Sequence, residues 1–146
     1  MSIVRTSTVA RCPKARAKIA ELEYHPYVLA HLDPVQAIHE EHNIVVAAYG
    51  PLTPILRHPG GPLKPVLDRL AEKYKTEPTS ILLRWTIQKN VVAITTSTNT
   101  SRLAGLAGVY DLELTPEEVA EIEEVGRKVY FRHYDVSLEH AISGVR

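Results

Sequence analysis

Hydroxyl side chains and an arginine gather between Thr95 and Arg102, directly after the apolar run 91–94. This spacing predicts the end of a buried strand that leads into the first turn of a helix. A helix amino terminus carries partial positive charge and unpaired N–H groups, so Arg102 is unfavourable there unless an anion joins it. Two interpretations stay open: a phosphate site, or hydroxyls that cap the helix while Arg102 points into water.

Other groups offer weaker chemistry. His39 and His42 could share a metal with Glu40 or Glu41, but histidines near a helix carboxyl end are more often solvated partners of its dipole. Cys12 has no activating neighbour beyond nearby basic residues, which favours a surface thiol. We therefore expect no metal site and no reactive cysteine. A solvated helix face is expected from Glu117, Glu118, Glu121, Glu123 and Glu124.

Apolar runs alternate with amphipathic stretches along the chain, and these elements would position the candidate groups. The predicted strands are 19–23, 44–49 and 91–94, and the predicted helices are 34–42, 63–74, 79–89, 100–109 and 115–128. The run 44–49 is apolar enough for a strand buried on both faces of a parallel sheet. Alternating strands and helices imply a parallel α/β sheet with right-handed crossovers.

Local signals indicate several helix ends. Asp33 followed by Pro34 has the pattern of a cap and a first helical residue, and Asn43 can end the same helix. Thr115 and Glu118 have the spacing of a capping box. These signals give the expected helices defined boundaries.

Length and composition suit one globular domain. The chain has 146 residues, of which 45% are hydrophobic and 23% are charged. Its 17 basic and 17 acidic residues give a formal net charge of zero, so no global charge attracts nucleic acid or a membrane surface. A single cysteine forms no internal disulfide, which favours a cytoplasmic protein. Segment 1–18 shows no clear period and is expected to be poorly ordered.

Four motifs follow one another along the chain: Glu23-Tyr24-His25-Pro26-Tyr27, Val45-Val46-Ala47-Ala48-Tyr49-Gly50-Pro51-Leu52, Ile81-Leu82-Leu83-Arg84-Trp85 and the stretch from Ile94 to Arg102. In this order they resemble the aldo-keto reductases. The resemblance covers about residues 19–125 and implies the last three strand–helix units of that family's (β/α)8 TIM barrel. Residues 19–146 would then be the carboxyl-terminal part of a barrel that is incomplete in its amino-terminal half.

The resemblance implies a nicotinamide cofactor site at the carboxyl ends of the strands, where barrels also bind phosphate. Tyr49 matches the family tyrosine that stacks on the nicotinamide. Arg102 matches the arginine that holds the 2′-phosphate of NADP, which favours the anion-site interpretation. The loop at the pyrophosphate matches Gly50, Pro51, Leu52 and Thr53, and the loop around the adenosine ribose matches Thr96, Ser97, Thr98 and Asn99.

Three positions depart from the family pattern. Thr96 stands where the family usually has a lysine, so one charged partner of the 2′-phosphate is missing. Arg102 still favours NADP(H) over NAD(H). Glu21 stands where many relatives have the glutamine that binds the nicotinamide carboxamide, and an ionised glutamate can only accept from the amide NH₂. Leu106 replaces an asparagine that relatives often present to the adenine.

The residues that perform carbonyl reduction in the family have no counterpart in this sequence. That reaction uses a tyrosine acid with a lysine, an aspartate and a histidine, all from the first half of the barrel. No matching motif precedes Ile19, and Tyr24, His25 and Tyr27 belong to a later strand. Because alkoxide formation needs a proton donor, we expect no catalytic residue in this chain.

The preferred hypothesis is a truncated NAD(P)H-dependent aldo-keto reductase that keeps part of its cofactor site and alone reduces no aldehyde or ketone. The alternative is a non-catalytic nucleotide-binding or regulatory half-barrel. Unpaired strand edges and apolar faces also predict self-association. The aromatic segment 130–134 fits either a remnant of a substrate loop or a tail packed across the barrel.

Overall fold

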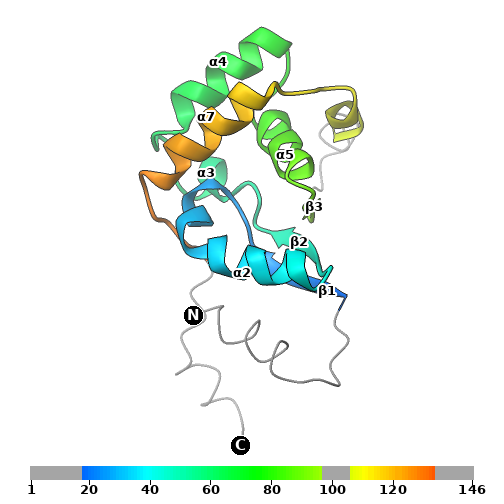
Figure 1. Ribbon diagram of the computed structural model, residues 1–146. Coiled ribbons are helices and arrows are strands. Elements are labelled where there is room, and N and C mark those ends of the chain that lie inside the picture. The colour runs from blue at the N-terminus through cyan, green and yellow to red at the C-terminus, as the bar shows by residue number, and fades with distance from the viewer. Residues whose placement is uncertain (1–17, 97–105, 134–146) are drawn as a thin grey trace, which may run out of the picture.

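A computed structural model describes residues 18–96 and 106–133, which form a parallel sheet flanked by helices (Figure 1). The strands β1 (Ile19–Glu23), β2 (Val45–Tyr49) and β3 (Val92–Ala93) lie in the order β1-β2-β3, and both pairs are parallel. The helices are η1 (Pro26–Val28), α2 (Leu29–Glu41), α3 (Thr53–Leu56), α4 (Lys64–Tyr74), α5 (Pro78–Gln88), η2 (Gly108–Tyr110) and α7 (Pro116–Arg127). The expected α/β architecture with parallel strands is confirmed.

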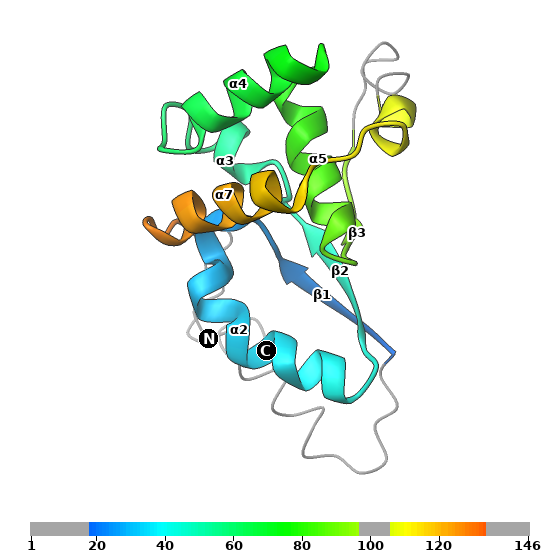
Figure 2. The ribbon, with the colours of Figure 1, turned by 45° about the horizontal axis from the view of Figure 1, so that its top comes forward.

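The two faces of the sheet differ in burial. Leu22, Val46 and Ala48 share one face of the sheet and are buried in the same cluster as side chains of α2. Helix α2 runs along the sheet (Figure 2). On the other face Ile19 lies beside Val45 in the register, and they are 65% and 47% exposed. The expectation that the 44–49 strand is buried on both faces is therefore wrong at its amino end. The reason is that right-handed crossovers bring the helices to one side of the sheet.

The third strand is also shorter and more exposed than expected. Only Val92–Ala93 of the apolar run 91–94 pair with β2, and Val92 is 53% exposed. Val92 lies opposite Ala47 on the same face as Val45, away from α2. An apolar run thus marked a strand correctly but did not reveal which of its side chains are covered.

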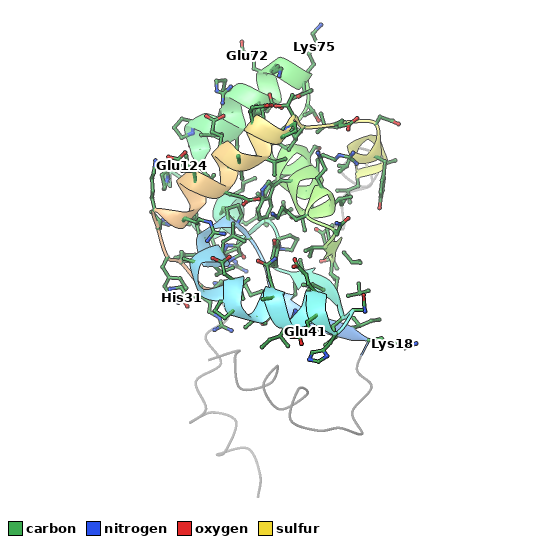
Figure 3. All side chains as sticks on the ribbon, in the orientation of Figure 1. Lys18, His31, Glu41, Glu72, Lys75 and Glu124 are labelled. Atoms are coloured by element: carbon green, nitrogen blue, oxygen red, sulfur yellow. The ribbon has the colours of Figure 1, made fainter. Side chains whose placement is uncertain are left out.

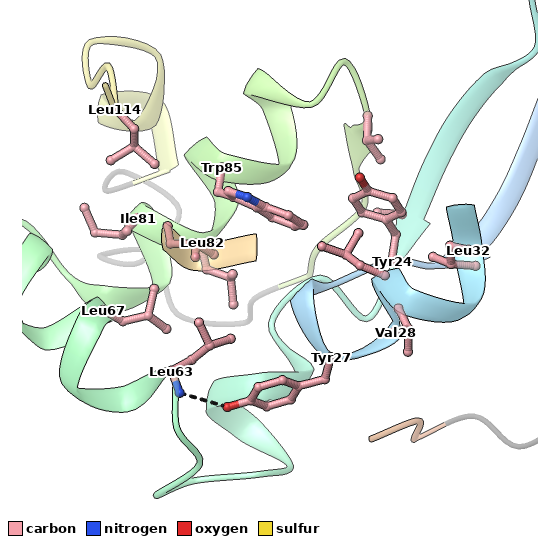
Figure 4. Close-up of a cluster of buried hydrophobic side chains, with 14 of the residues drawn as sticks. Tyr24, Tyr27, Val28, Leu32, Leu63, Leu67, Ile81, Leu82, Trp85 and Leu114 are labelled. Atoms are coloured by element: carbon pink, nitrogen blue, oxygen red, sulfur yellow. Dashed lines mark hydrogen bonds between the residues drawn. The ribbon is translucent and has the colours of Figure 1, made fainter. Parts of the chain in front are cut away.

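The core fills the space between the sheet and the helices. Trp85 of α5 is fully buried, and its ring lies 5.6 Å from the ring of Tyr24 at an interplanar angle of 22° (Figure 4). Leu67 of α4 and Ile81 and Leu82 of α5 belong to the same cluster. The predicted helices 63–74 and 79–89, with these side chains inward, are confirmed.

Helix α2 begins earlier than the sequence signals indicated. It starts at Leu29, which is buried, so Pro34 lies inside the helix instead of at its first position. Proline there removes only the N–H that would bond to the carbonyl of Ala30, close to the open first turn. Burial of Leu29 and Leu32 against the core outweighs that loss. The expected role of Asp33 as a cap is wrong.

The carboxyl end of α2 agrees with the sequence. Asn43 adopts a φ of 52°, the left-handed conformation that ends many helices and that asparagine tolerates. The amide N–H of Ile44 donates to the carbonyl of His39 at 2.8 Å and satisfies one of the last carbonyls of the helix. Helix α3 differs from the expectation, because this four-residue helix lies inside the stretch expected to be an irregular loop.

The capping box of α7 is confirmed. Thr115 accepts from the amide of Glu118 at 3.3 Å, and the Glu118 carboxylate accepts from the amide of Thr115 at 2.9 Å. Glu118 also accepts from Lys73 and Tyr74 and is buried, so the acidic run is not a fully solvated face. Burial opposes ionisation of Glu118, but these hydrogen bonds together hold the pKa of its carboxyl below the usual value.

Charged side chains of both signs are distributed over the surface. The labelled residues Glu72 on α4, Lys75 just after α4 and Glu124 on α7 point outward (Figure 3). Among the described residues, no helix is long and apolar enough to cross a bilayer. The expected poorly ordered segment 1–18, apart from Lys18, and the segment 134–146 lie outside the described residues.

Candidate functional site

The carboxyl ends of the strands meet at one edge of the sheet. Glu23, the last residue of β1, pairs in register with Tyr49, the last residue of β2. The amide of Ile94, just beyond β3, donates to the carbonyl of Ala48 at 2.9 Å. The segments that follow each strand, including Gly50 after β2 and Thr96 after β3, therefore begin close together. Parallel α/β sheets bind ligands at this edge.

Tyr49 lies on the face of the sheet opposite the buried side chain of Ala48. It alternates with Ala48, which is buried on the helix-covered side, so its ring lies on the opposite face of the sheet. Glu21 lies on that same face, two residues before the end of β1. The structure thus brings together Glu21 and Tyr49, an exposed acceptor and a partly buried flat ring. Both groups fit a planar ligand that carries an amide donor.

The loop after β2 begins at Gly50, whose backbone conformation favours glycine. Gly50 has a φ of 63°, which side chains with a Cβ rarely adopt, and the amide of Thr53 donates to its carbonyl at 3.0 Å. Thr53 is only 3% exposed and Pro51 is buried, while Leu52 packs against the core. Little side chain is therefore accessible in this loop, and a ligand would approach the backbone.

The phosphate end of the predicted site is described only in part. Thr96 is exposed after the end of β3. Ser97, Thr98, Asn99 and Arg102 lie outside the described residues, so their grouping around an anion stays a prediction. The described geometry concerns the end of the site that Tyr49 would serve.

The conspicuous tyrosines near β1 have structural roles. Tyr24 is fully buried, its hydroxyl accepts from Gln36 at 3.1 Å, and burial raises the pKa of this phenol to about 12. Tyr27 is buried as well, and its hydroxyl accepts from the amide of Leu63 at 3.2 Å. Both hydroxyls therefore lie inside the core.

A buried charged cluster at the end of β1 was missed by reasoning from the sequence. The Glu23 carboxylate accepts from Nε2 of His25 at 3.0 Å and from the amide of His133 at 2.7 Å, and Nε of Arg132 lies 3.6 Å away. Burial lowers the pKa of His25 despite the neighbouring carboxylate. One signal was available: an acid inside an apolar strand needs buried partners.

The two histidines at the carboxyl end of α2 lie in different surroundings. His39 is 2% exposed, whereas His42 is exposed, so the expectation of solvated histidines is wrong for His39. Neither ring nitrogen of His39 has a hydrogen-bond partner in the described part of the chain, and burial lowers its pKa. Within residues 18–96 and 106–133, no group of three or more His, Cys, Asp or Glu side chains could hold a metal ion.

Comparison with known proteins gives one consistent answer. The chain matches the sequence profile of the Aldo/keto reductase family over residues 2–127. It is 27% identical to the NAD/NADP-dependent indole-3-acetaldehyde reductase of Schizosaccharomyces pombe over 137 residues, which cover 91% of this chain and 46% of that protein. It is 35% identical to aldo-keto reductase family 1 member A1 of Gallus gallus over 115 residues, covering 75% of this chain and 35% of that protein.

A third relative is the NADPH-dependent alpha-keto amide reductase of Saccharomyces cerevisiae, 27% identical over 122 residues that cover 81% of this chain and 39% of that protein. These curated relatives are thus matched over less than half of their own length.

Solved structures share the fold. The aldo/keto reductase from Brucella melitensis superposes with a TM-score of 0.62 at 25% identity, over 73% of this chain and 38% of that chain. The apo form of Gox0644 gives a TM-score of 0.73 at 24% identity, over 89% of this chain and 47% of that chain. The three-stranded sheet and its helices correspond to part of a (β/α)8 barrel. Since the family profile also spans most of the sequence, the chain belongs to the Aldo/keto reductase family.

Proposed function

We propose that this chain forms the carboxyl-terminal, cofactor-binding part of an NAD(P)H-dependent carbonyl reductase. The observation that carries the proposal is the position of Tyr49, whose ring lies at the carboxyl end of β2 on the face opposite α2 and shares that face with Glu21. Relatives described as NAD/NADP-dependent and NADPH-dependent reductases support a nicotinamide cofactor. Bound at this edge, the nicotinamide would supply hydride to the carbonyl carbon of an aldehyde or ketone.

Each residue of the site has a proposed task. The Tyr49 ring stacks against the nicotinamide, and the Glu21 carboxylate accepts from its amide NH₂. The backbone from Gly50 to Thr53 runs beside the pyrophosphate, and Arg102 pairs with the 2′-phosphate of NADP(H). Thr96, Ser97, Thr98 and Asn99 surround the adenosine ribose. Because Thr96 replaces a cation, the preference for NADP(H) over NAD(H) rests on Arg102.

We further infer that this chain alone does not reduce carbonyl compounds. Within the described residues, Tyr24 and Tyr27 are buried in the core, which keeps both hydroxyls away from an alkoxide. The alternative function, a non-catalytic nucleotide-binding half-barrel, is favoured by the same observation. The lone cysteine further favours the reducing cytoplasm as the compartment.

A fluorescence titration with NADPH tests cofactor binding. The Arg102→Ala variant should bind NADPH about 10–100 times more weakly than the unaltered chain, which is the equivalent of one charge-assisted hydrogen bond. Its affinity for NADH should be about the same as that of the unaltered chain. The control is Arg69→Ala, an arginine on α4 whose partner is Glu121, and this variant should bind NADPH as the unaltered chain does. Absence of NADPH binding by the unaltered chain would refute the proposal.

An aldehyde-reduction assay separates the two functions. NADPH consumption with a simple aldehyde should stay at the background rate for the purified chain. Turnover that disappears in Arg102→Ala would establish a reductase and rule out the non-catalytic module.

We also propose that the chain associates with itself through the sheet face that carries Ile19, Val45 and Val92. These side chains are exposed and apolar. Because the formal net charge is zero, two copies of the chain do not repel each other through their overall charge. Light scattering should detect dimers or larger species of the unaltered chain, whereas the Val45→Lys variant should be monomeric. A monodisperse monomer at all concentrations would refute this association.

A further inference from the structure

Four consecutive residues after α7 are fastened across the end of β1, and we call this segment, Tyr130–His133, the strap. The ring of Tyr130 lies 4.1 Å from that of His31 on α2. The amide of Phe131 donates to the carbonyl of Tyr27 at 3.3 Å. The ring of Phe131 stacks on His58 at 4.9 Å with an interplanar angle of 4°. The strap therefore contacts the η1–α2 segment and His58, both of which are far from it in the sequence.

Glu23 supplies the charged anchor of the strap. Its side chain is 1% exposed, accepts from the amide of His133 at 2.7 Å and forms an ion pair with Nε of Arg132 at 3.6 Å. A buried carboxylate is stable only when donors or cations surround it, so Arg132 and His133 stabilise Glu23 as much as Glu23 holds them.

His25 completes the anchor as a neutral donor. Its Nε2 lies 3.0 Å from Glu23, whereas Nδ1 has no partner among the described residues. This pattern assigns the proton to Nε2, and burial lowers the pKa of the ring, so it stays neutral. Arg132 adds a positive charge beside this buried carboxylate.

The strap contacts the end of β1, which lies beside the end of β2 that carries Tyr49. Glu23 is the register partner of Tyr49, and both side chains lie on the same face of the sheet. His58 belongs to the connection between α3 and α4, which continues the loop that begins at Gly50. Movement of the strap would therefore release Glu23 beside Tyr49 and His58 behind that loop.

We propose that Glu23 is a positioning residue: through Arg132 and His133 it holds the strap in place, and the strap fixes Tyr49 and the following loop for the nicotinamide half of a dinucleotide. This role rests on the proposed function, because it needs a cofactor at this edge. Glu23 acts through its neighbours and has no direct part in the chemistry.

Limited trypsin digestion without cofactor tests the anchor itself, because Arg132 is a trypsin site within the strap. Glu23→Gln keeps the size and the acceptor oxygen but removes the charge that binds Arg132, so cleavage after Arg132 should accelerate about tenfold. The matched control is Asp33→Asn, which removes the partner of Arg127 at 2.7 Å. This control should change cleavage after Arg132 less than about twofold.

Cofactor binding then tests the positioning role, with NADPH compared against adenosine 2′,5′-bisphosphate, which lacks the nicotinamide half. Glu23→Gln should weaken NADPH binding about fivefold and change binding of the bisphosphate less than about twofold. Equal loss for both ligands, or faster cleavage at every trypsin site, would mean general destabilisation and would overturn the proposal. If the unaltered chain binds no NADPH, the proposed function and the positioning role both fail, while the digestion still decides whether Glu23 anchors the strap.

Discussion

Gly126 gives the sharpest test of how α7 packs. Replacement of a helical glycine by alanine usually stabilises a helix by about 1 kcal/mol. Here a Cβ on Gly126 would lie 2.4 Å from Cβ of Pro26, 2.7 Å from its carbonyl oxygen and 2.8 Å from its carbonyl carbon. Two of these atoms are backbone atoms of η1, which cannot rotate away as the end of a side chain can. The helix itself must therefore move.

The magnitude follows from two opposing terms. Overpacking costs about 1–3 kcal/mol, and the backbone contacts place Gly126→Ala in the upper half of that range. Subtracting the gain in helix propensity of about 1 kcal/mol leaves a net loss of about 1–2 kcal/mol in the free energy of unfolding. Gly108→Ala is the matched control, because a Cβ there has no atom within 4 Å. That variant should change stability by no more than about 1 kcal/mol, in the stabilising direction.

The assay is urea unfolding followed by the fluorescence of Trp85, the single tryptophan, which is fully buried. The midpoint should fall for Gly126→Ala with an unchanged slope, since the surface exposed on unfolding stays the same. A Gly126→Ala chain as stable as the unaltered one, or more stable, would refute the reasoning. It would mean that α7 and η1 do not touch as closely as described.

The remaining predictions use the same assay. Thr115→Ala removes the acceptor of the Glu118 amide and should cost about 1 kcal/mol, whereas Thr115→Ser should cost much less; equal losses would contradict the capping box. Tyr27→Phe leaves the amide of Leu63 without its acceptor and should cost about 1–3 kcal/mol, and no loss would show that water replaces the hydroxyl. Stability should fall as the pH drops from about 7.5 to about 5.5, because burial lowers the pKa of His39 and the unfolded chain then binds the proton first. His39→Phe should reduce this loss, and an unchanged pH dependence would exclude His39 as a cause.

Local sequence signals predicted much of the fold because their physics is local. Asn43 ends α2 through its own backbone conformation, and Thr115 pairs with Glu118 three residues away. The helix start predicted from Pro34 was wrong because a contact between distant residues decides where α2 begins. The neighbours of Pro34 favour a helix start, but the decisive contact is the burial of Leu29 against elements distant in the sequence. Tertiary packing thus overrode a local preference.

In the candidate site, too, some positions could be predicted from local sequence, whereas others depend on residues far apart in the chain. The end of β2 at Tyr49 could be predicted from the sequence, because an apolar run followed by Gly50-Pro51 is typical of a strand end. The position of Glu21 on the same face then follows from the alternation of side chains along paired strands. The burial of Glu23 depends on Arg132 and His133, and no periodicity connects residues so far apart. Charge inside an apolar run can therefore flag a buried partner without naming it.

The Glu23 anchor also sets an order on how the protein is made. The hydrogen bond from His133 spans 110 residues of chain, which a ribosome adding roughly 5–20 residues per second completes in roughly 5–20 s. During that interval β1 exists without its anchor, and the Glu23 carboxylate stays hydrated. The strand synthesised first among the described elements is therefore finished last, when the strap arrives and expels water from its end.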